Sequence, residues 1–206
     1  MYSFRNDYSE GAHPKVLQAL ADTNLRQTVG YGMDPCCQAA ADTIRRLCAA
    51  PDAAVHFLVG GTQVNLVTID AFLQSYEAVV AAQTGHVSTH ETGAIEATGH
   101  KVCTVESPDG KLTPALVESV LAGHNGTEHM VLPRMVYISD TTEIGTVYTR
   151  AELAALRQCC DVHGLFLYLD GARLGSALTF TGQSAVLEDR EQIEICLLYT
   201  SPSPRD

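Results

Sequence analysis

Short apolar runs alternate with helix-like segments along most of this chain, and the connections between them are short. Four runs have the length and composition of single buried strands: 78–82, 101–105, 135–139 and 165–169. Strands that alternate with helices favour an α/β fold, in which a mostly parallel sheet lies between helices. Ligands of such sheets bind at the edge formed by the carboxyl ends of the strands. Functional residues are therefore expected directly after the apolar runs.

Capping residues locate the helices between these runs. Asp34 followed by Pro35 predicts a helix start, and Pro51 marks the limit of that helix. Thr149 and Glu152 have the spacing of a capping box, and their helix is expected to stop at Gly164. Further helices are predicted over 14–21, 62–73 and 114–123. A further short strand is predicted over 55–59, just before Gly60-Gly61.

Charge and cysteine content narrow the class of protein. A net charge of −11 argues against nucleic acid or an anionic membrane as the main partner. No apolar run approaches the roughly 18 residues needed to span a bilayer, and the polar start does not resemble a signal peptide. The seven cysteines contain no Cys-x-x-Cys pair, which favours reduced thiols over a disulfide framework. We therefore expect a cytoplasmic protein.

Two motifs follow the predicted strands on the ligand side. Gly60-Gly61-Thr62 precedes a helix, whose free backbone N–H groups can bind a phosphate, although Gly-Gly turns of this kind also occur without one. His86 and His90, with Glu91 beside them, are four residues apart, as in some metal sites. The His-Glu-x-x-His order and a third conventional ligand are missing, so no metal site is predicted.

Asp170 ends the apolar run 165–169 and is followed by Gly171 and Arg173. Burial of a carboxylate is costly unless a donor or a cation meets it. Asp170 can cap the following turn or pair with Arg173. It can also hold the ring nitrogen of a pyridine cofactor protonated, with the phosphate of that cofactor at the start of a helix, as pyridoxal phosphate requires. The residues alone leave these alternatives open.

Five motifs in order resemble the threonine aldolase / β-eliminating lyase family of fold-type-I pyridoxal-phosphate enzymes. The resemblance covers residues 1 to about 190, and it implies the large cofactor-binding domain of that fold. Two of the motifs supply most of its specificity: Gly61-Thr62-Gln63-Val64-Asn65-Leu66 and Leu169-Asp170-Gly171-Ala172-Arg173. The other three support it: Phe4-Arg5-Asn6-Asp7-Tyr8-Ser9, Val29-Gly30-Tyr31-Gly32 and Thr84-Gly85-His86.

The resemblance implies a cofactor, pyridoxal 5'-phosphate, and a role for each matching residue. Asp170 would keep the pyridine nitrogen protonated, and Gly61 and Thr62 would bind the phosphate. His86 would stack on the ring and lie near the substrate hydroxyl, so His86 and Asp170 are the expected catalytic residues.

The resemblance also implies how substrate is bound. Arg173 would reach the cofactor's phenolic oxygen or the substrate carboxylate. Asn6 stands where relatives often have a serine near that carboxylate, and Tyr31 would reach the site of a second subunit in a homodimer or homotetramer. The implied reaction is aldol cleavage of threonine or allo-threonine to glycine and acetaldehyde. Another amino-acid lyase reaction, such as β-elimination, and a non-catalytic scaffold or pseudoenzyme are the alternatives.

One implied residue has no match. Relatives attach the cofactor to a lysine in a Gly-Thr-Lys-like turn after a further strand, whereas this chain has only Lys15, Lys101 and Lys111. We therefore interpret residues 1–195 as a large domain truncated before that lysine, and we expect this chain to be inactive. Residues 196–206 show neither a helical nor a strand period, and we interpret them as a non-native tail.

Overall fold

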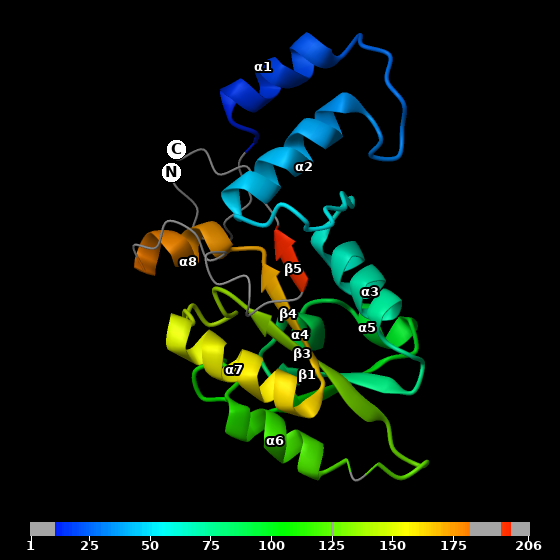
Figure 1. Cartoon of the computed structure of the whole chain (residues 1–206), viewed down its shortest axis with the longest axis vertical. Helices are drawn as coiled ribbons and strands as arrows, with labels where there is room; N and C mark the ends of the chain where they lie inside the picture. Colours follow the sequence, from blue (N-terminus) through cyan, green and yellow to red (C-terminus); the bar gives the residue numbers. More distant parts are fainter. Residues whose placement is uncertain (1–10, 125, 182–194, 199–206) are drawn as a thin grey trace.

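The computed structural model describes residues 11–124, 126–181 and 195–198, which form an α/β fold (Figure 1). Within these residues a five-stranded sheet has the order β2-β1-β3-β4-β5, and every neighbouring pair is parallel. The strands are β1 Glu77–Ala82, β2 Lys101–Val105, β3 Leu132–Ser139, β4 Phe166–Gly171 and β5 Ile195–Leu198. The predicted fold class, a mostly parallel sheet between helices, is confirmed.

The helices start and end close to the predicted capping residues. Asp34 Oδ1 accepts hydrogen bonds from the amides of Cys36 and Cys37, and Thr149 and Glu152 form the predicted capping box before Gly164. No helix in the described ranges is long and apolar enough to cross a membrane. The helices are α1 Pro14–Thr23, α2 Pro35–Leu47, α3 Gly61–Phe72, α4 His86–Thr89, α5 Ala94–Ala97, α6 Pro114–Ala122, α7 Arg150–His163 and α8 Leu174–Thr181.

Alternating side chains of the strands build two cores, one on each face of the sheet. Val80, Val136 and Leu167 point to the face covered by α6 and α7. The neighbouring residues Val79 and Met135 point to the opposite face, where α3, α4 and α5 pack. This period of two is what a sheet buried on both faces requires. Figure 1 shows α1 and α2 at one end of the molecule, and α1 has no buried residue.

Two sequence predictions about regular structure are wrong. Residues 55–59 form no strand, and Val59 is 92% exposed, because no described strand lies beside this run to share a hydrogen-bond ladder. Residues 196–198 of the predicted irregular tail belong to β5, where Leu197 pairs with Asp170 of β4. The predicted non-native origin of the tail stays a prediction, and residues 199–206 lie outside the described part of the chain.

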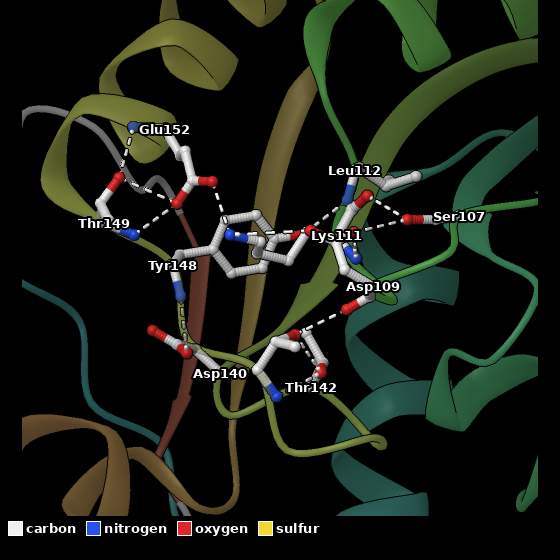
Figure 2. A network of polar contacts seen from close by, with 10 residues as sticks. Ser107, Asp109, Lys111, Leu112, Asp140, Thr142, Tyr148, Thr149 and Glu152 are labelled. Atoms are coloured by element: carbon white, nitrogen blue, oxygen red, sulfur yellow. Dashed lines mark hydrogen bonds and ion pairs between the residues drawn. The ribbon is translucent and has the colours of Figure 1, made fainter. Parts of the chain in front are cut away.

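A polar network fixes the loop that follows β3 (Figure 2). The Tyr148 hydroxyl accepts a hydrogen bond of 2.6 Å from the buried Leu112 amide, and the Tyr148 amide donates to Asp140 Oδ1. Lys111 Nζ lies 2.5 Å from Glu152 Oε1. Burial raises the pKa of Asp140 to about 6. The Asp140 amide in turn donates to the Asp170 carbonyl, so this network supports the sheet edge at which Asp170 lies.

Removal of the Tyr148 hydroxyl is expected to destabilise the fold. Tyr148→Phe leaves the Leu112 amide buried without its acceptor, which costs about 1–3 kcal/mol. The free energy of unfolding from urea titration measures the effect. Tyr76→Phe is the matched control, because Tyr76 is 60% exposed and its hydroxyl is not part of this network. Equal stability of the two variants would show that the Leu112–Tyr148 bond contributes nothing.

Candidate active site

Asp170 lies near the carboxyl end of β4 and is only 6% exposed. Its Oδ1 atom accepts a hydrogen bond of 3.0 Å from the Ala172 amide. Its Oδ2 atom accepts hydrogen bonds from the Tyr137 hydroxyl at 2.5 Å and, over a longer 3.4 Å, from Asn65 Nδ2. Asp170 thus caps the following turn, as one alternative predicted. A carboxylate has about four lone-pair sites, so capacity for one further donor remains.

Two buried tyrosines line this carboxylate. The rings of Tyr137 on β3 and Tyr168 on β4 lie in register and meet edge to face, with centroids 5.3 Å apart. Burial and the neighbouring Asp170 raise the pKa of Tyr137 well above its usual value, so its hydroxyl remains a donor. The Tyr168 hydroxyl donates to Asn65 Oδ1 at 2.7 Å. Sequence analysis did not identify either tyrosine, although both lie in predicted strands one or two residues before the ligand edge.

His86 begins α4 at the same edge of the sheet. His86 Nδ1 lies 2.7 Å from Glu91 Oε1, and this hydrogen bond is the main reason why the pKa of His86 is raised. The negative charges of Glu143, Glu91 and Asp170 act in the same direction, while burial opposes them. The His86 and His90 rings stack, with centroids 5.4 Å apart and planes 22° apart. Their arrangement is therefore that of a ring pair and not of two converging ligands.

Helix α3 links the motif with the predicted phosphate-binding residues Gly61 and Thr62, here called the phosphate motif, to Asp170. Gly61 and Thr62 form its first turn, and no side chain caps this end of the helix. A Cβ atom added at Gly61 would meet no atom within 4 Å, so the space above the turn is open. One turn later, Asn65 is 1% exposed and contacts both Asp170 and Glu91. The motif Gly61 to Leu66 thus contributes the uncapped backbone N–H groups at the start of α3 and the buried side chain of Asn65.

The three predicted substrate-binding residues have different outcomes. Arg173 is half-buried next to the site, and its guanidinium lies 3.9 Å from Glu143 Oε2. Tyr31 is fully exposed in the loop between α1 and α2, so its predicted contact with a second subunit stays a prediction. Asn6 lies outside the described residues.

None of the three lysines is among the residues that hydrogen-bond to the Asp170 side chain. Lys15 is exposed in α1, and Lys101 is the first residue of β2, at the amino edge of the sheet. Lys111 is held by Glu152 and Asp109 in the network of Figure 2. That none of them occupies the cofactor-binding position stays a prediction.

A second cluster of titratable side chains lies between α6 and α7. Ligand atoms of Glu118, Cys159 and His163 lie within 4.8 Å of one another. Burial raises the pKa of the Cys159 thiol and so favours the protonated form, which is a poor metal ligand. The cluster is separate from the polar residues around Asp170.

Comparison with known proteins identifies the family. A model of the beta-eliminating lyase family matches residues 4–190 of this chain. The chain belongs to the beta-eliminating lyase family. The match covers the same part of the chain as the resemblance predicted from the motifs, which is thereby confirmed. It includes the phosphate motif, His86 and Asp170.

Relatives and solved structures of this lyase family agree with that assignment. Low specificity L-threonine aldolase from Pseudomonas aeruginosa is 36% identical over 183 residues, which are 88% of this chain and 52% of that protein. The Pseudomonas sp. enzyme of the same name is 37% identical over 181 residues, 87% of this chain and 52% of that protein. The chain therefore spans about half the length of these relatives.

A structure of Leishmania major threonine aldolase superposes with a TM-score of 0.92 at 52% identity, over 95% of this chain and 57% of that one. The structure of an aromatic amino acid beta-eliminating lyase/threonine aldolase from Exiguobacterium sp. matches with a TM-score of 0.64 at 21% identity, over 94% of this chain and 51% of that one. The second match supports the fold alone.

Proposed function

We propose that the whole protein is a pyridoxal-phosphate-dependent aldolase that cleaves threonine or allo-threonine to glycine and acetaldehyde. Members of this family are pyridoxal-phosphate-dependent lyases, and the two Pseudomonas relatives are L-threonine aldolases by name. The observation that carries the proposal is the buried Asp170 carboxylate, held by Tyr137 and Asn65 at the ligand edge of the sheet. A cytoplasmic location and a homodimer or homotetramer are parts of the same proposal.

The residues present fit the cofactor at both of its ends. Asp170 has capacity for one more donor on a buried carboxylate, which suits a protonated ring nitrogen. The amino end of α3 at Gly61 and Thr62 is open and has the positive potential that favours a phosphate. When bound, pyridoxal phosphate supplies an electron-withdrawing ring that weakens the bonds at the Cα atom of an amino acid. Asp170 maintains the charge that makes this ring effective.

His86 has the chemistry to move the proton of a substrate hydroxyl. Its Nδ1 atom is hydrogen-bonded to Glu91, which raises the pKa of His86, and its side chain is 31% exposed. A general base of this kind contributes roughly 10²–10⁴-fold to the rate. Arg173 is proposed to bind the cofactor's phenolic oxygen or the substrate carboxylate, since it is half-buried and follows Asp170 by three residues. Tyr31 and Asn6 are proposed to complete the substrate site.

The name of the family favours β-elimination as a second candidate reaction. Both reactions need the same ring nitrogen partner and phosphate site, so the cofactor residues do not separate them. An assay of the whole protein on threonine, allo-threonine, serine and tryptophan separates the two reactions. We expect acetaldehyde from the first two substrates and neither pyruvate from serine nor indole from tryptophan.

Gly61→Val is expected to weaken binding of pyridoxal phosphate without weakening binding of pyridoxal. The valine side chain fills the open space above the first turn of α3 and excludes the phosphate from its amides. Loss of one hydrogen bond to a charged group costs about 1.5–3 kcal/mol, or roughly 10- to 100-fold in affinity. Titration of the purified chain with each ligand, followed by absorbance, measures both affinities.

Gly11→Val is the control for this substitution, because an added Cβ at Gly11 also meets no atom within 4 Å. Gly11 precedes α1 and is remote in sequence from the phosphate motif. A Gly61→Val chain that loses affinity for pyridoxal as strongly as for pyridoxal phosphate would contradict the assignment of the phosphate site.

A further inference from the structure

Glu91 is a buried carboxylate with two partners and no assigned role. Its side chain is fully buried, five residues after His86. Its Oε1 atom lies 2.7 Å from His86 Nδ1 and accepts a hydrogen bond of 2.8 Å from Asn65 Nδ2. Its Oε2 atom is buried and has no hydrogen-bond partner in the described part of the chain. A half-satisfied buried carboxylate is costly for stability, so a simple stabilising role does not account for it.

The hydrogen bonds around Asn65 fix which atoms donate to Glu91. The Asn65 Oδ1 atom accepts a hydrogen bond from the Tyr168 hydroxyl. The Nδ2 group therefore faces Glu91 and Asp170 and donates to both. An ionised Glu91 carboxylate only accepts hydrogen bonds. His86 Nδ1 must then carry its proton toward Glu91, and the lone pair of the neutral ring lies on Nε2.

We propose that Glu91 is a positioning residue that fixes the His86 proton on Nδ1 and leaves Nε2 as the nitrogen that takes the proton of the substrate hydroxyl. The part of this inference that concerns substrate rests on the proposed function. In many enzymes a carboxylate orients a catalytic histidine by hydrogen bonding to the ring nitrogen that does not face the substrate. The Glu91 carboxylate has this position relative to His86. In this proposal Glu91 acts through His86 and contacts neither the cofactor nor the substrate.

Other charged groups also face His86, but their effect differs in kind. Glu143 and Asp170 raise the pKa of His86 by charge alone, and their effects are smaller than that of the hydrogen bond that His86 makes to Glu91. The charge of Glu143 is partly offset by Arg173 at 3.9 Å. His90 stacks on the ring and is itself titratable. Within the described residues, the hydrogen bond to Glu91 is the one that reaches a ring nitrogen of His86 and so selects a tautomer.

The ¹⁵N resonances of the imidazole rings test this inference in the chain itself, without cofactor. A pH titration of the ¹⁵N-histidine-labelled chain is expected to give His86 as the Nδ1–H tautomer, with a pKa above that of an ordinary histidine. Glu91→Gln removes the charge at almost constant volume. It is expected to lower the pKa of His86, because the charged partner that raises it is lost, and to populate the Nε2–H tautomer. His86→Asn identifies the resonances of His86.

Glu96→Gln is the matched control, since Glu96 is an exposed glutamate on α5, five residues after Glu91. It is expected to leave the His86 resonances unchanged. A wild-type chain with His86 as the Nε2–H tautomer overturns the proposal, and this measurement does not depend on how well the variant folds. An unchanged tautomer and pKa in a folded Glu91→Gln chain also overturn it. Failure of pyridoxal-phosphate binding would count against the proposed function and leave the His86 tautomer as measured.

Discussion

Saturated with pyridoxal phosphate, the 206-residue chain is expected to release no measurable glycine or acetaldehyde from threonine. Aldol cleavage in this family depends on a lysine that binds the cofactor covalently, as the resemblance implies. Lys15 and Lys101 lie in α1 and at the amino end of β2, and Lys111 Nζ is bound to Glu152. An enzyme-linked assay of acetaldehyde measures turnover. The Pseudomonas aeruginosa relative serves as the positive control.

Borohydride reduction supplies an independent readout of the same prediction. Reduction of the cofactor-loaded chain followed by mass spectrometry is expected to leave its mass unchanged, because no lysine forms a covalent link at the site. Sustained acetaldehyde release together with a pyridoxyl adduct would contradict the prediction. Lys111→Arg would then be the first variant to examine, since Lys111 lies in the network that supports the Asp170 edge.

Asp170→Asn is expected to lower the affinity of the chain for pyridoxal phosphate about 10- to 100-fold. Asparagine has nearly the same shape, and its amide oxygen can still accept from the Ala172 amide, while its Nδ2 group replaces the oxygen that faces Tyr137. The negative charge that favours a protonated ring nitrogen is lost. A hydrogen bond to a charged group contributes about 1.5–3 kcal/mol, which corresponds to this range of affinity. Equilibrium dialysis with absorbance detection measures the dissociation constants.

Asp52→Asn makes the same chemical change at an exposed position and is expected to leave binding unaltered. Thermal unfolding of both variants separates loss of affinity from loss of fold. Unaltered affinity in a folded Asp170→Asn chain would argue against a cofactor role for Asp170. It would favour the alternative in which the fold survives as a scaffold without chemistry.

The parts of the fold that depend on local pattern could be predicted from the sequence. Asp34 and Thr149 cap their helices because capping needs only the next three residues. The position of Asp170 at the ligand edge followed from one apolar run and the rule for parallel sheets. Residues 55–59 have an equally good strand pattern, but a strand also needs a neighbour, which a single segment does not reveal.

The parts of the site that depend on long-range contacts could not be predicted in this way. Tyr137 meets Asp170 because β3 and β4 pair in one particular register, and no local pattern specifies that register. Glu91 was noted only as a neighbour of His90, and its burial depends on how α3 packs over the loop. A charged residue five positions after His86 was the available signal, and it is a weak one.

The position of Asn65 in α3 has a consequence for how sequence change can affect this family. One helical turn separates the first amides of α3 from the amide side chain that contacts both Asp170 and Glu91. An α-helix advances about 5.4 Å per turn and rotates about 100° per residue. A single-residue insertion between Gly61 and Asn65 would therefore swing the amide off both carboxylates. The turn thus sets the distance between the proposed phosphate site and Asp170, so a change in its length is expected to disrupt both.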